Sequence, residues 1–228
     1  MRWAHIDWKE DGQPEAPDFG DVYFSALGGL DETNHVFLNG NRLRERFKTA
    51  QHFTIIETGF GTGLNFLATW KLWQEVAPTD ATLHYISTEK FPLTLEDLSK
   101  ALSLWQELEP LPTSLLTNYI NILKQPSVNI NNNLKISLHI GDVKETLPRI
   151  TEKADAWFLD GFSPSKNPDM WQQELYQNMA SLSHTGTTLA TFTSAGHVRR
   201  GLEKEGFVMS KQKGFAHKRE MITGIFRP

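Results

Sequence analysis

The chain has 228 residues, 39% of them hydrophobic and 22% charged, and its 27 acidic and 23 basic side chains give a net charge of −4. This length and composition suit one α/β domain with a sizeable core. The absence of cysteine excludes a disulfide scaffold and thiolate metal sites, and the histidines show no paired metal-ligand spacing, so we expect no metal. No apolar run approaches the roughly 20 residues that cross a bilayer. The start of the chain also lacks a signal-peptide core, which favours a cytoplasmic protein without membrane contact.

The N-terminal part of the chain is expected to form an extension on the main unit. We assign residues 1–50 to a flap beside the mouth of a ligand site and residues 51–228 to a single folding unit. Residues 1–20 are polar and contain several prolines and glycines, which predicts irregular surface chain. Residues 21–24 and 36–40 are predicted to pair as two short extended segments.

From residue 53 onward, apolar runs and helical patterns alternate along the chain. The predicted strands are 53–57, 83–88, 134–140, 155–160, 187–192, 206–211 and 219–226. The predicted helices include 42–48, one that starts after Thr94, one around 115–123 and one that starts at Asn167 and Pro168, and a turn is predicted at 129–133. Right-handed crossovers then give a doubly wound, mostly parallel α/β sheet of seven strands that ends in an antiparallel hairpin.

A glycine-rich turn follows the first of these strands. Gly59, Gly61 and Gly63 stand at alternate positions between the run at 53–56 and a helical apolar pattern that begins at Leu64. Such a strand-to-helix turn exposes backbone N–H groups and admits a ligand without a Cβ in the way. The spacing G-x-G-x-G differs from the G-x-G-x-x-G of dinucleotide-binding proteins.

Glu57, two residues before the first glycine, indicates which ligand the turn binds. A carboxylate there would repel a pyrophosphate, but it can accept a hydrogen bond from an amino group. S-adenosylmethionine (SAM) has an α-amino group and no phosphate, so we predict that it is the ligand. A tight turn that binds no ligand is the alternative interpretation.

Four of the predicted strands have a carboxylate at or just after their carboxyl end: Glu57, Glu89, Asp142 and Asp160. Ligands of open α/β sheets bind outside the carboxyl ends of the strands, so we expect these side chains in one crevice. Glu89 can accept both hydroxyls of a ribose, and Asp142 can accept from the exocyclic amine of adenine. Asp160 would then stand where the methyl group leaves the cofactor, and could accept a proton from an amine nucleophile.

One segment, DAWFLDGFSPSKNPDMW at 155–171, closely resembles the methyltransferase domain of the MnmC family of bacterial tRNA-modifying enzymes. Further matches are 57–65, 89–94, 191–196, 198–202, 213–215 and 218–221, so the resemblance covers nearly the whole chain. It implies a Rossmann-like, SAM-dependent methyltransferase fold. It also implies N-methylation of 5-aminomethyl-2-thiouridine at the tRNA wobble position, which gives 5-methylaminomethyl-2-thiouridine.

The predicted cofactor site combines the glycine turn with the strand ends. Its residues are Glu57, Thr58, Gly59, Gly61, Gly63, Asn65, Glu89, Lys90, Phe91, Gly141, Asp142, Asp160 and Phe162. Within this set, the resemblance implies that Asp160 is the catalytic residue at the reacting amine. Phe91 or Phe162 could stack on the adenine, although each could equally be part of the core.

The C-terminal part of the chain is basic although the whole chain is acidic. Residues 196–228 hold eight bases and three acids, and residues 1–40 hold two bases and eight acids. A basic face on an acidic protein can bind the phosphates of RNA. The candidate tRNA-contacting residues are Tyr23, Lys166, Arg199, Arg200, Lys211, Lys213, Lys218 and Arg219.

Many members of the resembled family continue into a flavin-dependent oxidase domain that forms the aminomethyl group. This sequence ends at Pro228. We therefore expect a stand-alone methyltransferase or a separated half, monomeric, whose substrate comes from a separate flavin oxidase or another aminomethyl-forming enzyme.

Three other functions stay open at this point. A SAM-dependent methyltransferase acting on a small-molecule or protein amine could use the same sheet and acids, and only the basic C-terminal part argues against it. A nucleotide-sugar or NAD-dependent oxidoreductase is disfavoured by the glycine spacing and by the lack of a Tyr-x-x-x-Lys pair. A non-catalytic binding module is disfavoured by the complete series of strand-end acids.

Overall fold

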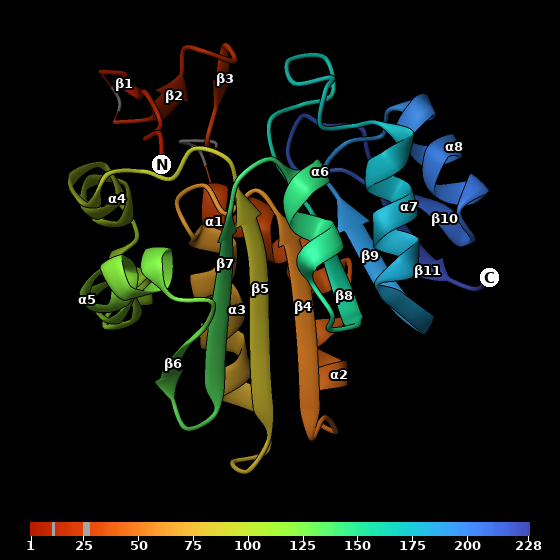
Figure 1. Cartoon of the computed structure of the whole chain (residues 1–228), viewed down its shortest axis with the longest axis horizontal. Helices are drawn as coiled ribbons and strands as arrows, with labels where there is room; N and C mark the ends of the chain where they lie inside the picture. The colour runs from red at the N-terminus through yellow and green to blue at the C-terminus, as the bar shows by residue number, and fades with distance from the viewer. Residues whose placement is uncertain (11, 25–27) are drawn as a thin grey trace.

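The computed structural model describes residues 1–10, 12–24 and 28–228. These residues form one large sheet with helices on both faces, and a small N-terminal sheet that lies beyond the ends to which the central strands point (Figure 1). Among the described residues, no helix combines the length and apolar character that crossing a membrane would require.

The elements follow one another in the alternating order that the sequence predicts from residue 53 onward. The strands are β1 (Asp7–Trp8), β2 (Pro14–Ala16), β3 (Asp21–Val22), β4 (His52–Thr58), β5 (Thr82–Glu89), β6 (Val128–Asn131), β7 (Leu134–Ile140), β8 (Ala154–Leu159), β9 (Ser183–Thr191), β10 (Phe207–Lys213) and β11 (Glu220–Phe226). The α-helices are α1 (Gly29–Thr33), α2 (Leu43–Phe47), α3 (Leu64–Val76), α4 (Leu95–Leu102), α5 (Leu111–Lys124), α6 (Val143–Thr146), α7 (Gln173–Ser181) and α8 (Gly196–Lys204). A π-helix covers Asn34–Asn39, and 3-10 helices cover Gln106–Leu108 and Leu147–Arg149.

The large sheet has the strand order β10-β11-β9-β8-β4-β5-β7-β6. Its central strands, from β9 to β7, pair in parallel. Strand β11 is antiparallel to both β9 and β10, and forms the C-terminal hairpin. The predicted mostly parallel sheet with an antiparallel hairpin is therefore confirmed, and the sheet gains one further strand, β6, at its edge.

Strand β6 lies where the sequence predicted only a turn, at 129–133. It pairs antiparallel with β7, so the turn itself is confined to the two residues that join them. The backbone N–H of Asn133 donates to the side chain of Asn131 at 2.8 Å, which closes this turn. The asparagines of this segment favour a turn, and the sequence pattern therefore does not indicate the short edge strand that leads into the turn.

Alternate residues of the central strands enter two separate cores. In β4, Ile55 belongs to the cluster that includes residues of α3 and α5, whereas Ile56 belongs to the cluster that includes residues of α7 and α8. In β8, Phe158 belongs to the first of these clusters and Trp157 belongs to the second. Both faces of these strands are covered, which is why their sequences are continuously apolar.

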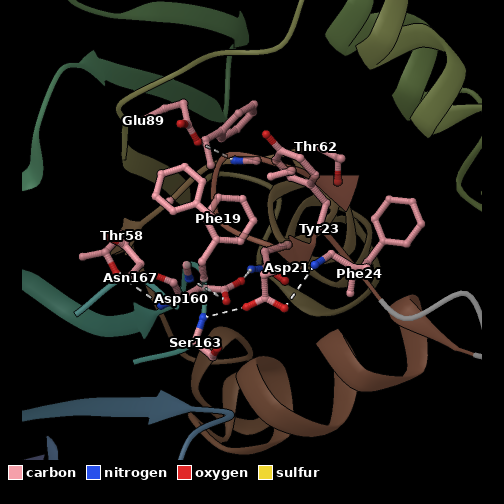
Figure 2. Close-up of a pocket in the computed structure, with 18 of the residues that line it drawn as sticks. Phe19, Asp21, Tyr23, Phe24, Thr58, Thr62, Glu89, Asp160, Ser163 and Asn167 are labelled. Carbon is pink, nitrogen blue, oxygen red and sulfur yellow. Dashed lines mark hydrogen bonds between the residues drawn. The ribbon is translucent and has the colours of Figure 1, made fainter. Parts of the chain in front are cut away.

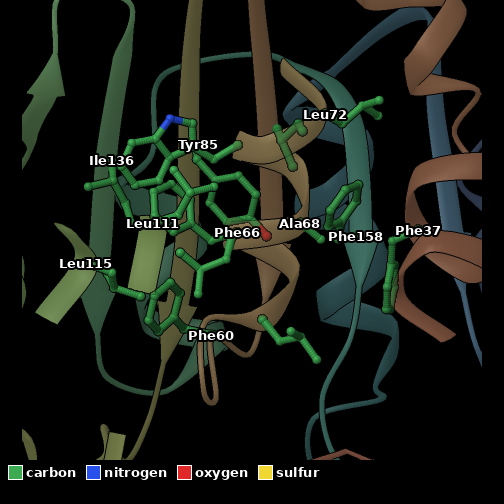
Figure 3. Close-up of a cluster of buried hydrophobic side chains, with 14 of the residues drawn as sticks. Phe37, Phe60, Phe66, Ala68, Leu72, Tyr85, Leu111, Leu115, Ile136 and Phe158 are labelled. Carbon is green, nitrogen blue, oxygen red and sulfur yellow. The ribbon is translucent and has the colours of Figure 1, made fainter. Parts of the chain in front are cut away.

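The first of these cores is rich in aromatic side chains. Figure 3 shows Phe66 of α3 beside Tyr85 of β5, with ring centroids 5.2 Å apart. Phe37 and Phe158 also lie together, with centroids 5.2 Å apart. Because Phe37 precedes the first strand of the large sheet, the N-terminal residues share this core with α3 and β8.

The predicted extended segment at 36–40 is wrong, because the chain forms a π-helix there. Val36, Phe37 and Leu38 are all buried, which a helical turn permits and a half-exposed strand would not. The amide of Asn41 then donates to the carbonyls of Phe37 and Trp157, and so fixes the end of this segment against β8. The other half of the predicted pair, at 21–24, does contain a strand, but it pairs with β2.

The predicted helix start at Asn167 and Pro168 is also wrong, because α7 begins at Gln173. Residues 163–172 instead form successive turns, in which the N–H of Met170 donates to the carbonyl of Asn167. The indole of Trp171 donates to the carbonyl of Phe162 at 2.9 Å. This bond holds the loop against the residues that follow β8, and α7 begins only after the loop.

The remaining helix predictions are confirmed. The helix expected at 42–48 is α2, and the helix expected around 115–123 lies within α5. Helix α4 begins directly after Thr94 as predicted, and Thr94 caps it, since its hydroxyl oxygen accepts from the N–H of Asp97 at 3.1 Å.

The glycines of α8 provide a matched test of its packing. A Cβ at Gly201 would collide with the buried ring of Tyr176 in α7, whereas one at Gly196 would meet only the mobile end of Arg200 at 2.9 Å. We expect Gly201→Ala to lower the free energy of unfolding by about 2 kcal/mol through overpacking, and Gly196→Ala to leave it unchanged or raise it by up to about 1 kcal/mol. Urea denaturation of both variants measures the difference. Equal stabilities would contradict the packing of α7 on α8.

Candidate active site

A cavity of about 750 Å³ lies at the carboxyl ends of the parallel strands. Its wall combines residues from the N-terminal segment, the exits of β4, β5, β7 and β8, and the turn between β10 and β11. Most of the residues predicted for the cofactor site meet here. Those lining the cavity are Thr58, Gly59, Gly61, Asn65, Glu89, Lys90, Phe91, Gly141, Asp142, Asp160 and Phe162.

The glycine turn follows β4 and leads into α3. Gly59, Gly61 and Gly63 have φ angles of 91°, 53° and 73°, a region that residues with a side chain rarely adopt. A Cβ on Gly59 would stand 3.2 Å from the Cα of Gly161, so a glycine at position 59 lets the turn pass close to the exit of β8. Gly63 does not line the cavity; it precedes the first residue of α3.

Glu89, at the end of β5, holds the glycine turn in place. One carboxylate oxygen accepts from the N–H of Gly61 at 2.9 Å, and the other accepts from the N–H of Phe91 at 2.8 Å. Burial raises the pKa of Glu89, although these backbone N–H groups favour its ionised form. Each oxygen keeps a further lone pair, with which it can accept a hydrogen bond from the hydroxyl of a ligand in the cavity.

Asp142 follows β7 and is paired with Lys90, which follows β5. One of its oxygens accepts from the ammonium of Lys90 at 2.8 Å, and the other accepts from the N–H of Lys144 at the start of α6. Burial acts to raise the pKa of Asp142, but the Lys90 and Lys144 contacts outweigh it and lower the pKa below its usual range. The carboxylate therefore stays ionised as an acceptor at this end of the cavity.

Asp160 stands at the exit of β8 in the wall of the cavity. Its Oδ1 accepts from the N–H of Gly161 at 2.8 Å, and its Oδ2 accepts from the amide of Asn65 at 2.7 Å. The hydroxyl of Thr58 donates to its backbone carbonyl at 2.8 Å, which ties the ends of β4 and β8 together. Burial raises the pKa of Asp160 to about 6, despite the two donors.

Glu57 lies beneath the cavity and not in its wall. Its carboxyl group is fully buried and accepts from the amide of Asn65 at 2.9 Å and from the hydroxyl of Ser87 at 2.7 Å. The geometry therefore does not support the expected direct contact between Glu57 and the amino group of a cofactor. Burial, followed by the charge of Asp160, raises the pKa of Glu57 to about 8.

The stability of the folded chain should depend on pH through Glu57. The folded state keeps a proton that the unfolded chain releases near pH 4.5, so the free energy of unfolding should fall as the pH rises to about 8. Asp160 contributes with the same sign only up to about pH 6. We expect Glu57→Gln to remove the decline between about pH 6 and 8, as measured by urea denaturation across that range. A decline of equal size in both proteins would show that another group causes it.

Aromatic residues of the N-terminal segment complete the wall opposite the strand ends. The ring of Phe19 stacks on Phe162 with centroids 4.5 Å apart, and Tyr23 meets Phe162 edge-on at 5.4 Å. Figure 2 shows Phe19 and Tyr23 in the part of the cavity that also contains Glu89 and Asp160. Tyr23, named above as a candidate tRNA contact, lines this cavity.

Phe19 and Asp21 are site residues that the sequence reasoning missed. The carboxylate of Asp21 accepts from the N–H of Ser163 at 2.9 Å, and so joins the N-terminal segment to the loop after Asp160 (Figure 2). Their segment, residues 14–22, has only two short strands and no helical pattern. The only signal available was the general expectation that residues 1–50 form a flap.

The basic residues predicted to contact tRNA are spread over a wider surface. Lys218 lines the cavity and, with Arg219, also lines a second hollow of about 550 Å³ beside it. The ion pairs among them are Arg199 with Glu203, Lys211 with Glu220 and Lys218 with Glu32. The candidates outside both hollows are Lys166, Arg199, Arg200, Lys211 and Lys213.

A profile of the S-adenosyl-L-methionine-dependent methyltransferases matches residues 106–227, more than half of the chain. The chain belongs to this family. The predicted cofactor class is therefore confirmed, and the methyltransferase places Glu89, Asp142 and Asp160 where an open α/β sheet binds ligands.

Two curated relatives extend this assignment to nearly the whole methyltransferase. The chain is 52% identical over 227 residues to the "tRNA 5-methylaminomethyl-2-thiouridine biosynthesis bifunctional protein MnmC" of Methylobacillus flagellatus, covering 98% of this chain and 35% of the relative. It is 52% identical over 229 residues to the protein of the same name from Ectopseudomonas mendocina, with the same coverage. The methyltransferase thus spans about a third of the length of the curated relatives that it matches.

A solved structure supports the fold of the methyltransferase. The crystal structure of MnmC2 from Aquifex aeolicus superposes with a TM-score of 0.77 at 24% identity, covering 100% of this chain and 72% of that chain. The resemblance to the methyltransferase part of MnmC, first visible in the motif at 155–171, is confirmed by the two curated relatives, and the solved structure supports the fold.

Proposed function

We propose that this methyltransferase transfers the methyl group of SAM to the exocyclic amine of 5-aminomethyl-2-thiouridine at the tRNA wobble position. The product would be 5-methylaminomethyl-2-thiouridine. The observation that carries this proposal is the 52% identity, over 98% of the chain, to proteins named for the biosynthesis of that nucleoside. The position of Asp160 in the cavity supports it, because an amine nucleophile needs a proton acceptor nearby.

The residues of the cavity fit SAM in their chemistry. Hydroxyls of a ribose and the amine of an adenine are donors, and Glu89 and Asp142 offer acceptors at neighbouring strand ends. The glycine turn leaves space beside backbone N–H groups, which suits a carboxylate. When bound, SAM supplies a methyl group on a positively charged sulfonium, which is itself the leaving group.

Asp160 would act on the amine that receives the methyl group. Alkyl ammonium groups have pKa values near 10.4, so most of the substrate amine is charged and lacks a free lone pair at neutral pH. The ionised carboxylate of Asp160 would accept a hydrogen bond from the amine and take up a proton from it. The pKa of Asp160, raised to about 6, lies closer to the working pH than that of an exposed aspartate.

A base within tRNA must leave its stack to reach a cavity of this kind. The aromatic rings of Phe19, Tyr23 and Phe162 would contact the extruded base, and the cationic Lys218 stands at the same cavity. The proposed phosphate contacts are Lys166, Arg199, Arg200, Lys211, Lys213, Lys218 and Arg219, with Tyr23 at the base. Ion pairs with Glu203, Glu220 and Glu32 would have to open for three of them to bind phosphate.

We further propose that a separate flavin oxidase, or another enzyme that forms the aminomethyl group, supplies the tRNA substrate in the cytoplasm. The methyltransferase would act as a monomer on that tRNA. The proposal of a second enzyme rests on the name of the relatives, which are called bifunctional proteins of this biosynthesis.

Mass spectrometry of tRNA nucleosides tests the proposal. In a strain that lacks this protein we expect 5-aminomethyl-2-thiouridine to accumulate and its methylated form to disappear. The purified chain with SAM should restore the methyl group to that tRNA, with an affinity for tRNA that falls steeply as the salt concentration rises. Methylation of the free nucleoside as fast as of tRNA, or retention of the methylated form in the strain, would contradict the proposal.

A further inference from the structure

The side-chain amide of Asn65 bridges two acids, the buried Glu57 and Asp160 in the wall of the cavity. Its Nδ2 donates to Glu57 Oε1 at 2.9 Å and to Asp160 Oδ2 at 2.7 Å. An amide nitrogen has two hydrogens, so these two bonds use both of them. The donor group of Asn65 is therefore fully engaged by the protein and is not available to a ligand.

Thr33, at the end of α1, determines which way this amide faces. Its hydroxyl donates to Asn65 Oδ1 at 2.8 Å, and both side chains are buried, with 5% and 8% of their surface exposed. If the amide were turned over, its oxygen would face two carboxyl groups and lose the hydroxyl donor. In the observed orientation, the nitrogen donates to both acids and the oxygen accepts from the Thr33 hydroxyl.

Glu57 anchors the same amide from below. It is fully buried, and Ser87 on the neighbouring strand β5 donates to its second oxygen at 2.7 Å. Glu57 is therefore fixed in the core and cannot move toward a ligand that enters the cavity. Asn65 is held from both sides, by Thr33 on α1 and by Glu57 on β4, and presents its second N–H to Asp160.

The fixed Asn65 amide determines how the carboxylate of Asp160 is hydrogen-bonded. Without the Asn65 donor, its Oδ2 would have no hydrogen-bond partner among the residues that the structure describes, because the Gly161 N–H binds Oδ1. The other charges that act on Asp160 are Glu32 of α1, which raises its pKa, and Lys218 of the β10–β11 turn, which lowers it. Neither of them fixes the direction of the carboxylate, whereas the Asn65 amide does.

We infer that Asn65 is a positioning residue: held by Thr33 and Glu57, it orients the Asp160 carboxylate toward the reacting amine and stabilises its ionised form. This role differs from the direct cofactor contact that the sequence led us to expect for both Asn65 and Glu57. It rests on the proposed function, in which Asp160 accepts the proton of the amine.

A titration that needs no substrate tests the link between Asn65 and Asp160. The chain is labelled with carboxyl-¹³C aspartate, and the Asp160 resonance is identified by its absence in Asp160→Asn. We expect Asn65→Ala to raise the titration midpoint of Asp160 by about half a pH unit or more, because a donor to the ionised form is lost. Thr33→Val should raise it by a smaller amount, since the amide remains but loses its fixed orientation. An unchanged midpoint in both variants would overturn the inference.

A matched control is available on the same helix. Thr69 is buried one turn after Asn65, and its hydroxyl has no hydrogen-bond partner among the described residues. Thr69→Val makes the same chemical change as Thr33→Val without touching the bridge. It should leave the midpoint where it is in the wild type, and a midpoint that moves as far as in Thr33→Val would also overturn the inference.

Kinetics separate positioning from cofactor binding. For Asn65→Ala we expect kcat at saturating SAM to fall by about tenfold or more, with the acid limb of the pH profile displaced upward and the Kd of SAM within about threefold of the wild type. Thr33→Val, which preserves the core volume, should show the same pattern on a smaller scale. A Kd for SAM weakened tenfold with unchanged kcat would make Asn65 a cofactor ligand and overturn the inference.

The two levels of failure can be told apart. Absence of methyl transfer to tRNA by the wild-type chain contradicts the proposed function, and the carboxyl titration still decides whether Asn65 controls Asp160. A wild-type chain that is active on tRNA, together with variants that leave both the titration and kcat unchanged, contradicts only the role of Asn65.

Discussion

Replacing Asp160 by asparagine is expected to lower kcat by about 10²–10⁴-fold while changing the Kd of SAM by less than about threefold. The substituted side chain keeps nearly the same size and can still accept from the N–H of Gly161. It cannot accept a proton from the substrate amine. Isothermal titration with SAM and single-turnover methylation of aminomethylated tRNA measure the two quantities separately.

The pH dependence of kcat in the wild type should reflect the ionisation of Asp160. Because burial raises the pKa of Asp160 to about 6, kcat should decline as the pH falls below that value, where the carboxylate becomes protonated. In Asp160→Asn this acid limb should disappear together with most of the activity. Asp169→Asn is the matched control, since Asp169 also lines the cavity but is exposed and its loss removes the same charge. Equal losses of activity in the two variants would show that overall charge, and not Asp160 itself, is what matters.

Replacing Glu89 by glutamine is expected to weaken SAM binding by about a hundredfold, which corresponds to about 2.7 kcal/mol. The carboxylate accepts the N–H groups of Gly61 and Phe91 and has further lone pairs for the hydroxyls of a ribose. An amide offers one oxygen, so one backbone N–H loses its acceptor and one hydroxyl loses its partner. Each lost bond to a charged group costs about 1.5–3 kcal/mol, partly offset by relaxation of the turn.

Isothermal titration of Glu89→Gln with SAM measures this loss. Glu145→Gln serves as the control, because Glu145 lies on α6 near Asp142 but is exposed and does not line the cavity. We expect the control to bind SAM as the wild type does. An unchanged Kd in Glu89→Gln would mean that the glycine turn is held without Glu89 and that the ribose binds elsewhere.

The sheet and its acids could be predicted from the sequence because both follow from local patterns. Continuous apolar runs marked β4 and β8, whose faces are both covered, and alternating β and α elements implied crossovers that bring the strand ends together. The carboxylates after four strands therefore had to lie at one edge of the sheet. The structure brings Glu89, Asp142 and Asp160 into one cavity accordingly.

The parts that the sequence could not predict depend on contacts between distant segments. Glu57 has the right position for a ligand contact, but Asn65 and Ser87 occupy its oxygens and keep it below the cavity. Phe19 and Asp21 belong to a segment without periodicity, whose path is set by packing on Phe162 and by the bond to Ser163. No local rule of sequence specifies such pairings.

The hydrogen bond between Asp21 and Ser163 has a practical consequence for protein engineering. It couples the first residues of the chain to the loop that follows Asp160, and the Phe19 ring rests on the same loop. A catalytic fragment that begins near residue 51, at the start of the large sheet, would lack the wall of the cavity that the N-terminal segment forms. Tags, linkers or fusions should accordingly be planned so that the first two dozen residues keep their place against residues 160–163.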